Sequence, residues 1–399
     1  MKGWWIYLLP LLYFPNVIGF NGATPIGVLE LMDVVIFPLL GILIFLKTSD
    51  KKNMDLKPYK LLRQFIIWLI LGALIFPLKF DYPDSFPWLL TISKVAKFGL
   101  YIFFGYMVTL KYKSEYFNKY LLSLIVIGVF MAYSNVFLKY NMEEELARLL
   151  FSADNVLAVA LAALLSFFTY LAVYGKGIKR SVKLALLCSI PLILLGLLLS
   201  DGRAAIGAYV ISIGVMFLLK INSPKVWVGV ILASGLIVVF YFTQADFRGN
   251  LDRTINPSDE YLRKNKMDGY GFDDGKRFSG ISNEFPKYWE NPIFGTGFFH
   301  RGYKTGLMAM GSHNYYLQML LESGIVGFIF IMGFLKYLWT SSFRKKGSPV
   351  AFAFFLSLIS VYISSFTGEY LYASEALMML ILLMVPFLHT IKSNITINS

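Results

Sequence analysis

The chain has little charge, few histidines and almost no cysteine. Only 15% of its 399 residues are charged, against about 25% in soluble domains. Cys188 is the single cysteine, so the chain can form neither an internal disulfide framework nor a cysteine-based metal site. Because Cys188 lies in an apolar run, we expect it to be a small buried side chain. The three histidines have no carboxylate partner at a known metal-binding spacing, so we predict no metal site and no cofactor.

Long apolar runs are abundant, and hydrophobic residues make up 57% of the chain. A hydrocarbon core about 30 Å thick requires about 20 apolar residues per helix. Twelve segments are long enough to cross it: 4–20, 26–46, 64–80, 89–110, 119–138, 155–174, 183–200, 203–220, 225–243, 313–336, 349–366 and 371–390. The first lacks a small-residue cleavage site, so we interpret it as a retained helix and not a signal peptide. The sequence therefore predicts an all-α polytopic membrane protein with about 12 transmembrane helices.

Lys and Arg alternate from one side of the predicted helices to the other. If the N-terminus is inside, the inner loops hold most of the bases, and the short outer loops hold only Lys79, Lys139, Arg148 and Arg203. Short cytoplasmic loops carry the positive excess in membrane proteins, so we expect both termini to be cytoplasmic. This bias also accounts for the net charge of +13. Nucleic-acid binding is therefore not implied by the basic composition.

One connection is much longer than the rest. Residues 244–312 separate the ninth and tenth predicted helices and fall on the outer face. Long loops are often functional, and we expect a folded subdomain here. The predicted organisation is helices 1–9 in residues 1–243, the loop subdomain in 244–312, and helices 10–12 with a cytoplasmic tail in 313–399. Asn291-Pro292 indicates a turn that leads back to the membrane.

Ser312-His313-Asn314 opens the tenth predicted helix at the outer surface, with Ser312 as the expected cap. An imidazole has a pKa near neutrality and is the usual general base for a hydroxyl. His313 is therefore the candidate catalytic base, with Asn314 as a supporting residue. A histidine at a helix start is also often a structural or interfacial residue.

Several cations lie on the same side of the predicted membrane. Arg203 sits in a tight turn after the seventh helix, and Arg277, Arg301 and Lys304 belong to the long loop. Guanidinium groups bind phosphate oxygens in pairs, so this set suggests an anionic, lipid-linked substrate. For Arg203, an ion pair with Asp201 or snorkelling to lipid headgroups is the alternative.

Other polar residues fall inside apolar segments. Lys94 and Lys97 share a face of the fourth helix and either contact phosphate or, as we prefer, neutralise Glu30 and Asp33 of the second helix. Further along the chain, we expect Glu322 to be a hydrogen-bonded structural acid, and we expect Gly324 and Gly327 to form a small face for helix packing.

The motif region resembles a known family. Residues 291–297 read NPIFGTG, and Ser312-His313-Asn314 is followed by nine residues, Gly324, two residues and Gly327. This pattern resembles the signature of the O-antigen ligase and Wzy-type polysaccharide polymerase superfamily. Members of that superfamily also have about twelve helices, with a large outer loop directly before the motif.

The resemblance implies a metal-independent, inverting glycosyl transfer at the outer face of a bacterial inner membrane, without a cofactor. The donor would be an undecaprenyl-diphosphate-linked glycan, and His313 corresponds to the family's proposed base. Arg203 and Arg277 correspond to its diphosphate-binding arginines, and Arg301 is a residue that could share this role. Membrane lipids and other polysaccharide assembly proteins would be partners, whereas nucleic acid would not.

The acceptor separates the two main functions. A polymerase passes the chain to another lipid-linked repeat unit, and a ligase passes it to lipid A-core. We prefer the polymerase because polymerases are the more numerous and diverse members. A transporter or lipid flippase is an alternative of another class, but transporters bind their substrates near the membrane midplane, and the polar candidates here cluster at the outer surface.

Overall fold

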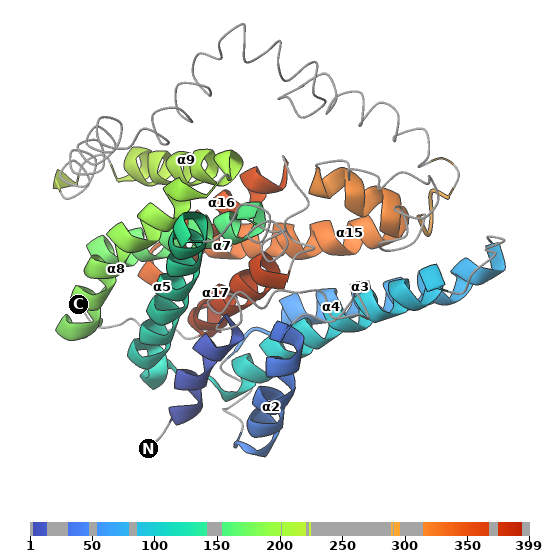
Figure 1. Cartoon of the computed structure of the whole chain (residues 1–399), viewed down its shortest axis with the longest axis horizontal. Coiled ribbons are helices and arrows are strands. Elements are labelled where there is room, and N and C mark those ends of the chain that lie inside the picture. Colours follow the sequence, from blue (N-terminus) through green and yellow to red (C-terminus); the bar gives the residue numbers. More distant parts are fainter. Residues whose placement is uncertain are drawn as a thin grey trace, which may run out of the picture.

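The computed structural model describes residues 3–13, 31–47, 54–79, 86–141, 154–200, 202–220, 223–224, 289, 291–295, 314–366 and 374–392. Within these ranges the elements are helices, and none is a strand, which confirms the predicted all-α class. The helices pack side by side into one body, with α7 and α16 near its middle (Figure 1).

Most helix boundaries lie within a few residues of the predicted apolar segments. The helix Lys57–Lys79, however, begins seven residues before the predicted segment 64–80, and the helix Tyr315–Arg344 ends eight residues after the predicted segment 313–336. The observed elements are η1 (Trp4–Leu12), α2 (Leu31–Phe45), α3 (Lys57–Lys79), α4 (Phe86–Lys111), η3 (Ser114–Tyr116), α5 (Phe117–Asn141), α7 (Asp154–Tyr174), α8 (Arg180–Leu199), α9 (Arg203–Leu219), α15 (Tyr315–Arg344), α16 (Pro349–Ser365) and α17 (Ser374–Lys392). The predicted helix over 225–243 lies outside the described residues. The first predicted helix differs in type, because η1 is a 3-10 helix that contains Pro10, a residue without a backbone N–H donor.

Several helices have the length and composition of membrane spans. In the described part of the chain these are Lys57–Ile75, Ser114–Ser134, Leu157–Tyr174, Arg180–Leu199 and Tyr315–Arg344. Shorter apolar helices are Val34–Phe45, Ala204–Leu219, Pro349–Ser365 and Ala376–Ile391. The protein is therefore a polytopic membrane protein in its described part, and the predicted number of 12 spans stays a prediction.

The core lies around α7, α16 and α17, whose side chains are mostly buried on all sides. A helix that is apolar all round is typical of the centre of a large protein. Hydroxyl groups link the two central helices, since Ser166 Oγ lies 2.8 Å from Ser360 Oγ and Ser357 Oγ donates to the Ala163 carbonyl over 2.8 Å. The helices α8 and α9 pack around this centre.

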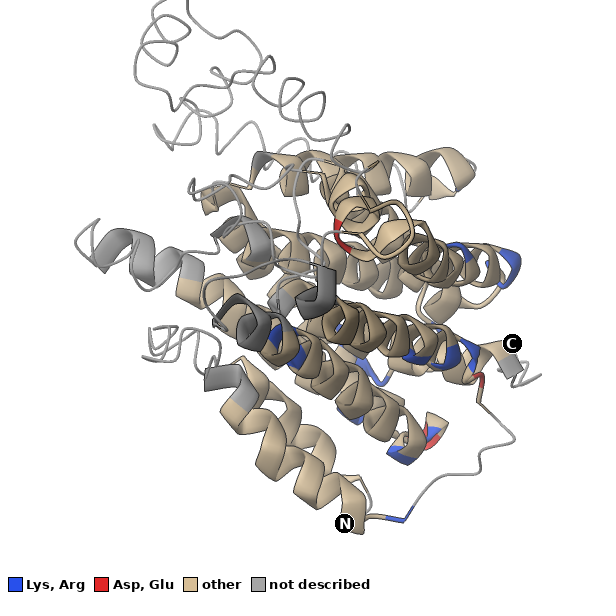
Figure 2. Cartoon of the chain, turned by 90° about the vertical axis from the view of Figure 1, so that its right-hand side faces the viewer, with Lys and Arg blue, Asp and Glu red and all other residues tan. Residues whose placement is uncertain are grey.

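Loops that are rich in Lys and Arg meet at one end of the body. Lys111 donates to the Leu46 carbonyl at the ends of α4 and α2. Asp55, before α3, donates its N–H to the Leu388 carbonyl of α17 over 3.3 Å and accepts from the Tyr337 hydroxyl of α15. In Figure 2 most of the Lys and Arg, drawn in blue, lie toward the lower right of the view, where the C-terminus is marked. The structure thus agrees with the alternating charge pattern, and the compartment that this end faces stays a prediction.

Cys188 is exposed on α8, so the expectation of a buried side chain was wrong. Leu184, Leu187 and Leu192 of the same helix are also exposed. An outer helix of a membrane protein turns apolar side chains toward lipid as well as toward the core, and hydropathy is the same for both environments.

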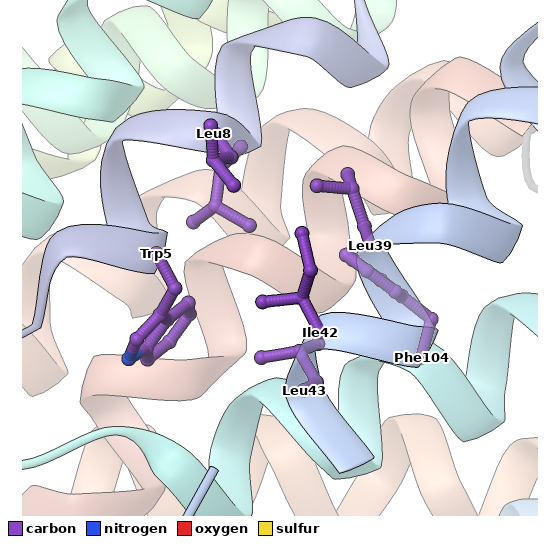
Figure 3. A pocket seen from close by; sticks show the side chains of 7 residues that line it. Trp5, Leu8, Leu39, Ile42, Leu43 and Phe104 are labelled. Atoms are coloured by element: carbon purple, nitrogen blue, oxygen red, sulfur yellow. The ribbon is translucent and has the colours of Figure 1, made fainter. Parts of the chain in front are cut away.

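A small pocket lies between η1, α2 and α4 (Figure 3). Its lining is Trp5, Leu8, Leu9, Leu39, Ile42, Leu43 and Phe104. These side chains offer no acid, base or anion-binding group, so the pocket is not a candidate site for the predicted chemistry.

Candidate functional site

The helix that follows the Ser-His-Asn motif begins at Tyr315, with Asn314 as its cap. Asn314 Oδ1 accepts a hydrogen bond from the Leu317 N–H over 3.1 Å, and Asn314 itself has an extended backbone. The expected cap, Ser312, was therefore wrong by two residues. Asn and Ser are equally good caps, and the helix starts where its first turn packs. His313 directly precedes the cap and lies outside the described residues.

Gly324 breaks α15 into two segments. Its φ of 64° and ψ of −175° are non-helical, in a region that is essentially restricted to glycine. Figure 1 shows the bend in α15, drawn in orange. The second segment, residues 325–344, is about 30 Å long at 1.5 Å per residue, which is enough to span a membrane by itself. The expectation that Gly324 serves a helix-packing face was wrong, because it is the point where the helix changes direction.

The turn at 291–295 docks onto this break. Ile325 donates its N–H to the Pro292 carbonyl over 2.8 Å, and Gly295 closes the turn with a 2.8 Å bond to the Asn291 carbonyl. A Cβ on Gly324 would overlap the Ile293 carbonyl, and one on Gly295, whose φ is 74°, would lie 2.5 Å from the carbonyl of Glu322. The two motifs therefore touch backbone to backbone, and both glycines are needed for the contact.

Trp68 of α3 completes the junction. Its ring stacks on Phe294, with centroids 4.6 Å apart and planes 5° from parallel. Its Nε1–H donates to the Ser323 carbonyl over 2.8 Å, so the backbone groups on both sides of the break have partners from outside α15. A Cβ on Gly327 would lie 2.5 Å from Cβ and Oγ of Ser323 and 2.9 Å from Trp68 Cδ1, so this glycine makes room for both side chains. Sequence reasoning missed Trp68, since one aromatic residue in an apolar helix has no local signal.

Glu322 lies beside the break and is buried. Its Oε1 accepts a hydrogen bond from Gln318 Nε2, one turn earlier in the first segment. The predicted hydrogen bond of this acid is confirmed. Buried charges that persist are paired or hydrogen-bonded, and this contact lies within the same segment that begins at Asn314.

Arg203 is the first residue of α9 and directly follows Gly202. Gly202 is buried, and a Cβ on it would overlap that of Ala158 in α7. The start of α9 is therefore packed closely against α7. The Arg203 side chain lies outside the described part of the structure.

The starts of α9 and α15 lie at the same end of α16. Ser212 of α9 donates to the Leu356 carbonyl over 3.0 Å, and Lys220 Nζ lies 5.8 Å from the Phe352 ring. The helices α9 and α16 are therefore antiparallel, and Arg203 lies level with the C-terminal end of α16.

The first turn of α15 contacts that same end of α16. Tyr316 donates its hydroxyl to the Tyr362 carbonyl over 3.2 Å and packs on Phe366, with centroids 4.7 Å apart. Two sequence-predicted regions, one that follows the seventh predicted helix and one that opens the tenth, therefore both lie at the same end of α16.

Of the other predicted site residues, the structure describes only Lys94 and Lys97. Arg277, Arg301 and Lys304 lie outside the described residues. Lys94 and Lys97 are half-buried in α4, and Lys97 Nζ lies 5.7 Å from the centre of the Tyr101 ring. The side chains of Glu30 and Asp33, their expected partners, are outside the described part. Within that part no cluster of three potential metal ligands occurs.

A match to a protein family covers this region. Residues 187–332 match the family model described as O-antigen ligase. The match includes most of α8, all of α9, the docked turn, the Ser-His-Asn motif and the break in α15. A search of curated proteins gave no match. The predicted resemblance of this chain to the O-antigen ligase and Wzy-type polymerase superfamily is therefore confirmed, with residues 187–332 as the matching part.

Proposed function

We propose that the protein is a membrane glycosyltransferase. It transfers glycan from an undecaprenyl-diphosphate-linked donor to a sugar hydroxyl at the outer face of the bacterial inner membrane. We assign it to polymerisation of O-antigen or surface polysaccharide repeat units, and transfer of polymer to lipid A-core is the alternative. The observation that carries the proposal is the family match over residues 187–332, whose two motif-bearing helices start at one end of α16.

In the proposed reaction, His313 accepts the proton of the acceptor hydroxyl. The acceptor oxygen attacks the anomeric carbon, the bond from that carbon to the diphosphate oxygen breaks, and the lipid diphosphate leaves. A single displacement of this kind inverts the anomeric centre. Arg203, Arg277 and Arg301 stabilise the charge on the departing diphosphate, with Lys304 as a further cation. In this mechanism the arginines supply the charge that a metal ion would otherwise provide.

The placement of the helix ends supports a diphosphate site near Arg203. The N-terminus of a helix carries a partial positive charge and free N–H groups, and both favour anions. The helices α9 and α15 begin at the same end of α16. Lys94 and Lys97 remain supporting candidates in α4. We further propose that residues 244–312 form a loop subdomain on the outer face, between membrane domains 1–243 and 313–399.

The test is donor turnover by purified protein with a lipid-diphosphate glycan. His313→Ala should lower the rate by about 10²–10⁴-fold, as expected for a lost general base, with normal insertion into the membrane. His300→Ala is the matched control in the same loop and should keep its rate. A chelator should leave the wild type unaffected. Wild-type turnover by His313→Ala would reject His313 as the base, and inhibition by chelator that only a divalent metal reverses would reject the metal-free mechanism.

Deletion in the native host separates the two acceptors. Loss of a polymerase leaves single-repeat caps on the glycan gel. Loss of a ligase leaves rough core and accumulated polymer. The second pattern would replace our assignment with the ligase.

A further inference from the structure

We propose that Trp68 is a positioning residue for the glycosyl transfer. It holds the 291–295 turn against the break in α15, and it thereby fixes the segment that carries His313. The inference rests on the proposed function for its kinetic consequence. Trp68 lies in α3, outside the residues that match the family model.

The Trp68 side chain contacts both the turn and the break in α15. The indole face lies on Phe294 of the turn, and the indole N–H is bonded to the Ser323 carbonyl at the break. Stacked aromatic pairs are stabilising beyond their buried area. An unpaired carbonyl in a membrane interior is strongly unfavourable. Trp68 therefore stabilises the turn and the break together, and loss of the indole weakens both.

One stretch of chain connects the docked turn to the start of α15. Residues 296–313 include Arg301 and His313, and they connect the docked turn to Asn314. The positions of both ends of this segment depend on the break. At one end Gly295 lies against the backbone of Glu322, and at the other the segment 315–323 departs from Gly324.

The short segment has little independent stability. It has nine residues, and isolated helices of fewer than about 12–15 residues are marginal even with good helix formers. Its direction is therefore set by its tertiary contacts, which include Tyr316 against α16 and the junction at Trp68. A shift at the break moves Asn314, and the residue before it is His313.

A positioning role of Trp68 and a role in packing alone predict different changes in kcat. A misplaced base lowers kcat, because displacement of about 1 Å costs about 10²-fold in rate. Arg203 belongs to α9, whereas Trp68 belongs to α3 and the break belongs to α15. We therefore expect donor binding through Arg203 to change much less. Lost packing alone would lower the amount of folded protein without changing the kcat of what remains.

The kinetic experiment compares Trp68→Leu, Trp68→Phe and the control Trp339→Leu. Trp339 also stacks on an aromatic ring, that of Tyr362, but in the second segment of α15. We expect Trp68→Leu to lower kcat about 10²-fold, with a much smaller change in the donor KM. Trp68→Phe keeps a ring against Phe294 and should recover part of the loss. Trp339→Leu should keep its kcat per folded molecule.

A double-mutant cycle tests the coupling. If Trp68 acts through the turn, Phe294→Leu combined with Trp68→Leu should lower kcat no further than the worse single variant, because residues in one contact are not additive. Additive losses, or equal kinetics for Trp68→Leu and Trp339→Leu, would overturn the positioning role.

Amide hydrogen exchange separates this inference from the proposed function. Ile325 and Gly295 both donate their N–H groups at the junction, so their exchange should speed up in Trp68→Leu and stay slow in Trp339→Leu. Unchanged exchange in Trp68→Leu would overturn the inference, whatever the protein catalyses. Faster exchange in that variant, with a wild type that never turns over the lipid-diphosphate donor, would instead reject the proposed function and the kinetic role that depends on it.

Discussion

The N–H of Ile325 donates to the carbonyl of Pro292 over 2.8 Å, which joins the second segment of α15 to the turn at 291–295. Non-helical backbone inside a membrane protein is tolerated where other protein groups satisfy it. Pro292 and Trp68 do so on the two sides of Gly324. The spacing of Gly324 and Gly327 thus has a physical meaning: the first glycine breaks the helix, and the second leaves room for the Ser323 side chain and the indole.

Gly324→Ala should destabilise the protein by at least about 1–3 kcal/mol, the cost of strain in a glycine-only backbone region. The new methyl would also meet the Ile293 carbonyl, so the turn must move. Thermal unfolding in detergent measures the change, and the donor turnover of the folded fraction should fall with it.

Gly333→Ala is the matched control for that substitution. Gly333 is helical, lies in the second segment of α15, and has nothing within 4 Å of its added Cβ. Alanine there should stabilise the protein by about 0.5–1 kcal/mol. Equal stability changes at the two positions would contradict the assigned break.

Hydropathy was sufficient to find most helices. The predicted spans 155–174 and 349–366 correspond to α7 (Asp154–Tyr174) and α16 (Pro349–Ser365). Hydropathy can find these helices because a membrane span needs about 20 consecutive apolar residues, which is a local property of the sequence. It cannot say which face meets lipid, and for that reason Cys188 was placed in the core although it is exposed.

The break and the cap depend on contacts that are distant in sequence. Gly324 in an apolar run fits a packing face as well as a kink, and only Pro292 and Trp68 decide between them. The choice of Asn314 over Ser312 follows from where the first turn of α15 meets α16. The Ser-His-Asn motif indicated His313 as a candidate, but no pattern in the sequence predicts that α3 contacts the turn and the break near this motif.

Asn314→Ala should cost about 0.5–2 kcal/mol, because the Leu317 N–H loses its cap. Asn314→Ser keeps an oxygen at the cap and should retain most of the stability and the donor turnover. The check is thermal unfolding together with turnover for both variants. If Ala and Ser variants behave alike, the cap contributes nothing to the start of α15.

A topology reporter tests the predicted orientation. A fusion partner that is active only outside the cytoplasm should be active within the 244–312 loop and silent after Lys52 or Lys345. The reason is the positive charge of the inner loops, which meet at one end of the body. Activity after Lys345 with silence in the loop would reverse the orientation and remove the proposed site from the outer face.

Arginine-to-lysine substitutions separate charge from geometry at the proposed diphosphate site. Lysine keeps the charge of Arg203 or Arg277 but loses the fork that binds two oxygens at once. Arg203→Lys and Arg277→Lys should therefore remain strongly impaired in donor turnover, normalised to inserted protein. Arg263→Lys and Lys264→Arg are the controls, and we expect them to be nearly silent, since a solvated charge needs no particular shape.

The outcome of these variants also decides what kind of site this is. Arg203 begins α9, whose N-terminal N–H groups and partial positive charge add to any anion site there. If the donor is bound through paired contacts, this background charge cannot replace the lost fork. Near-normal turnover by both Arg203→Lys and Arg277→Lys would show that a positive potential is enough, and the assignment of paired guanidinium–phosphate contacts would then be wrong.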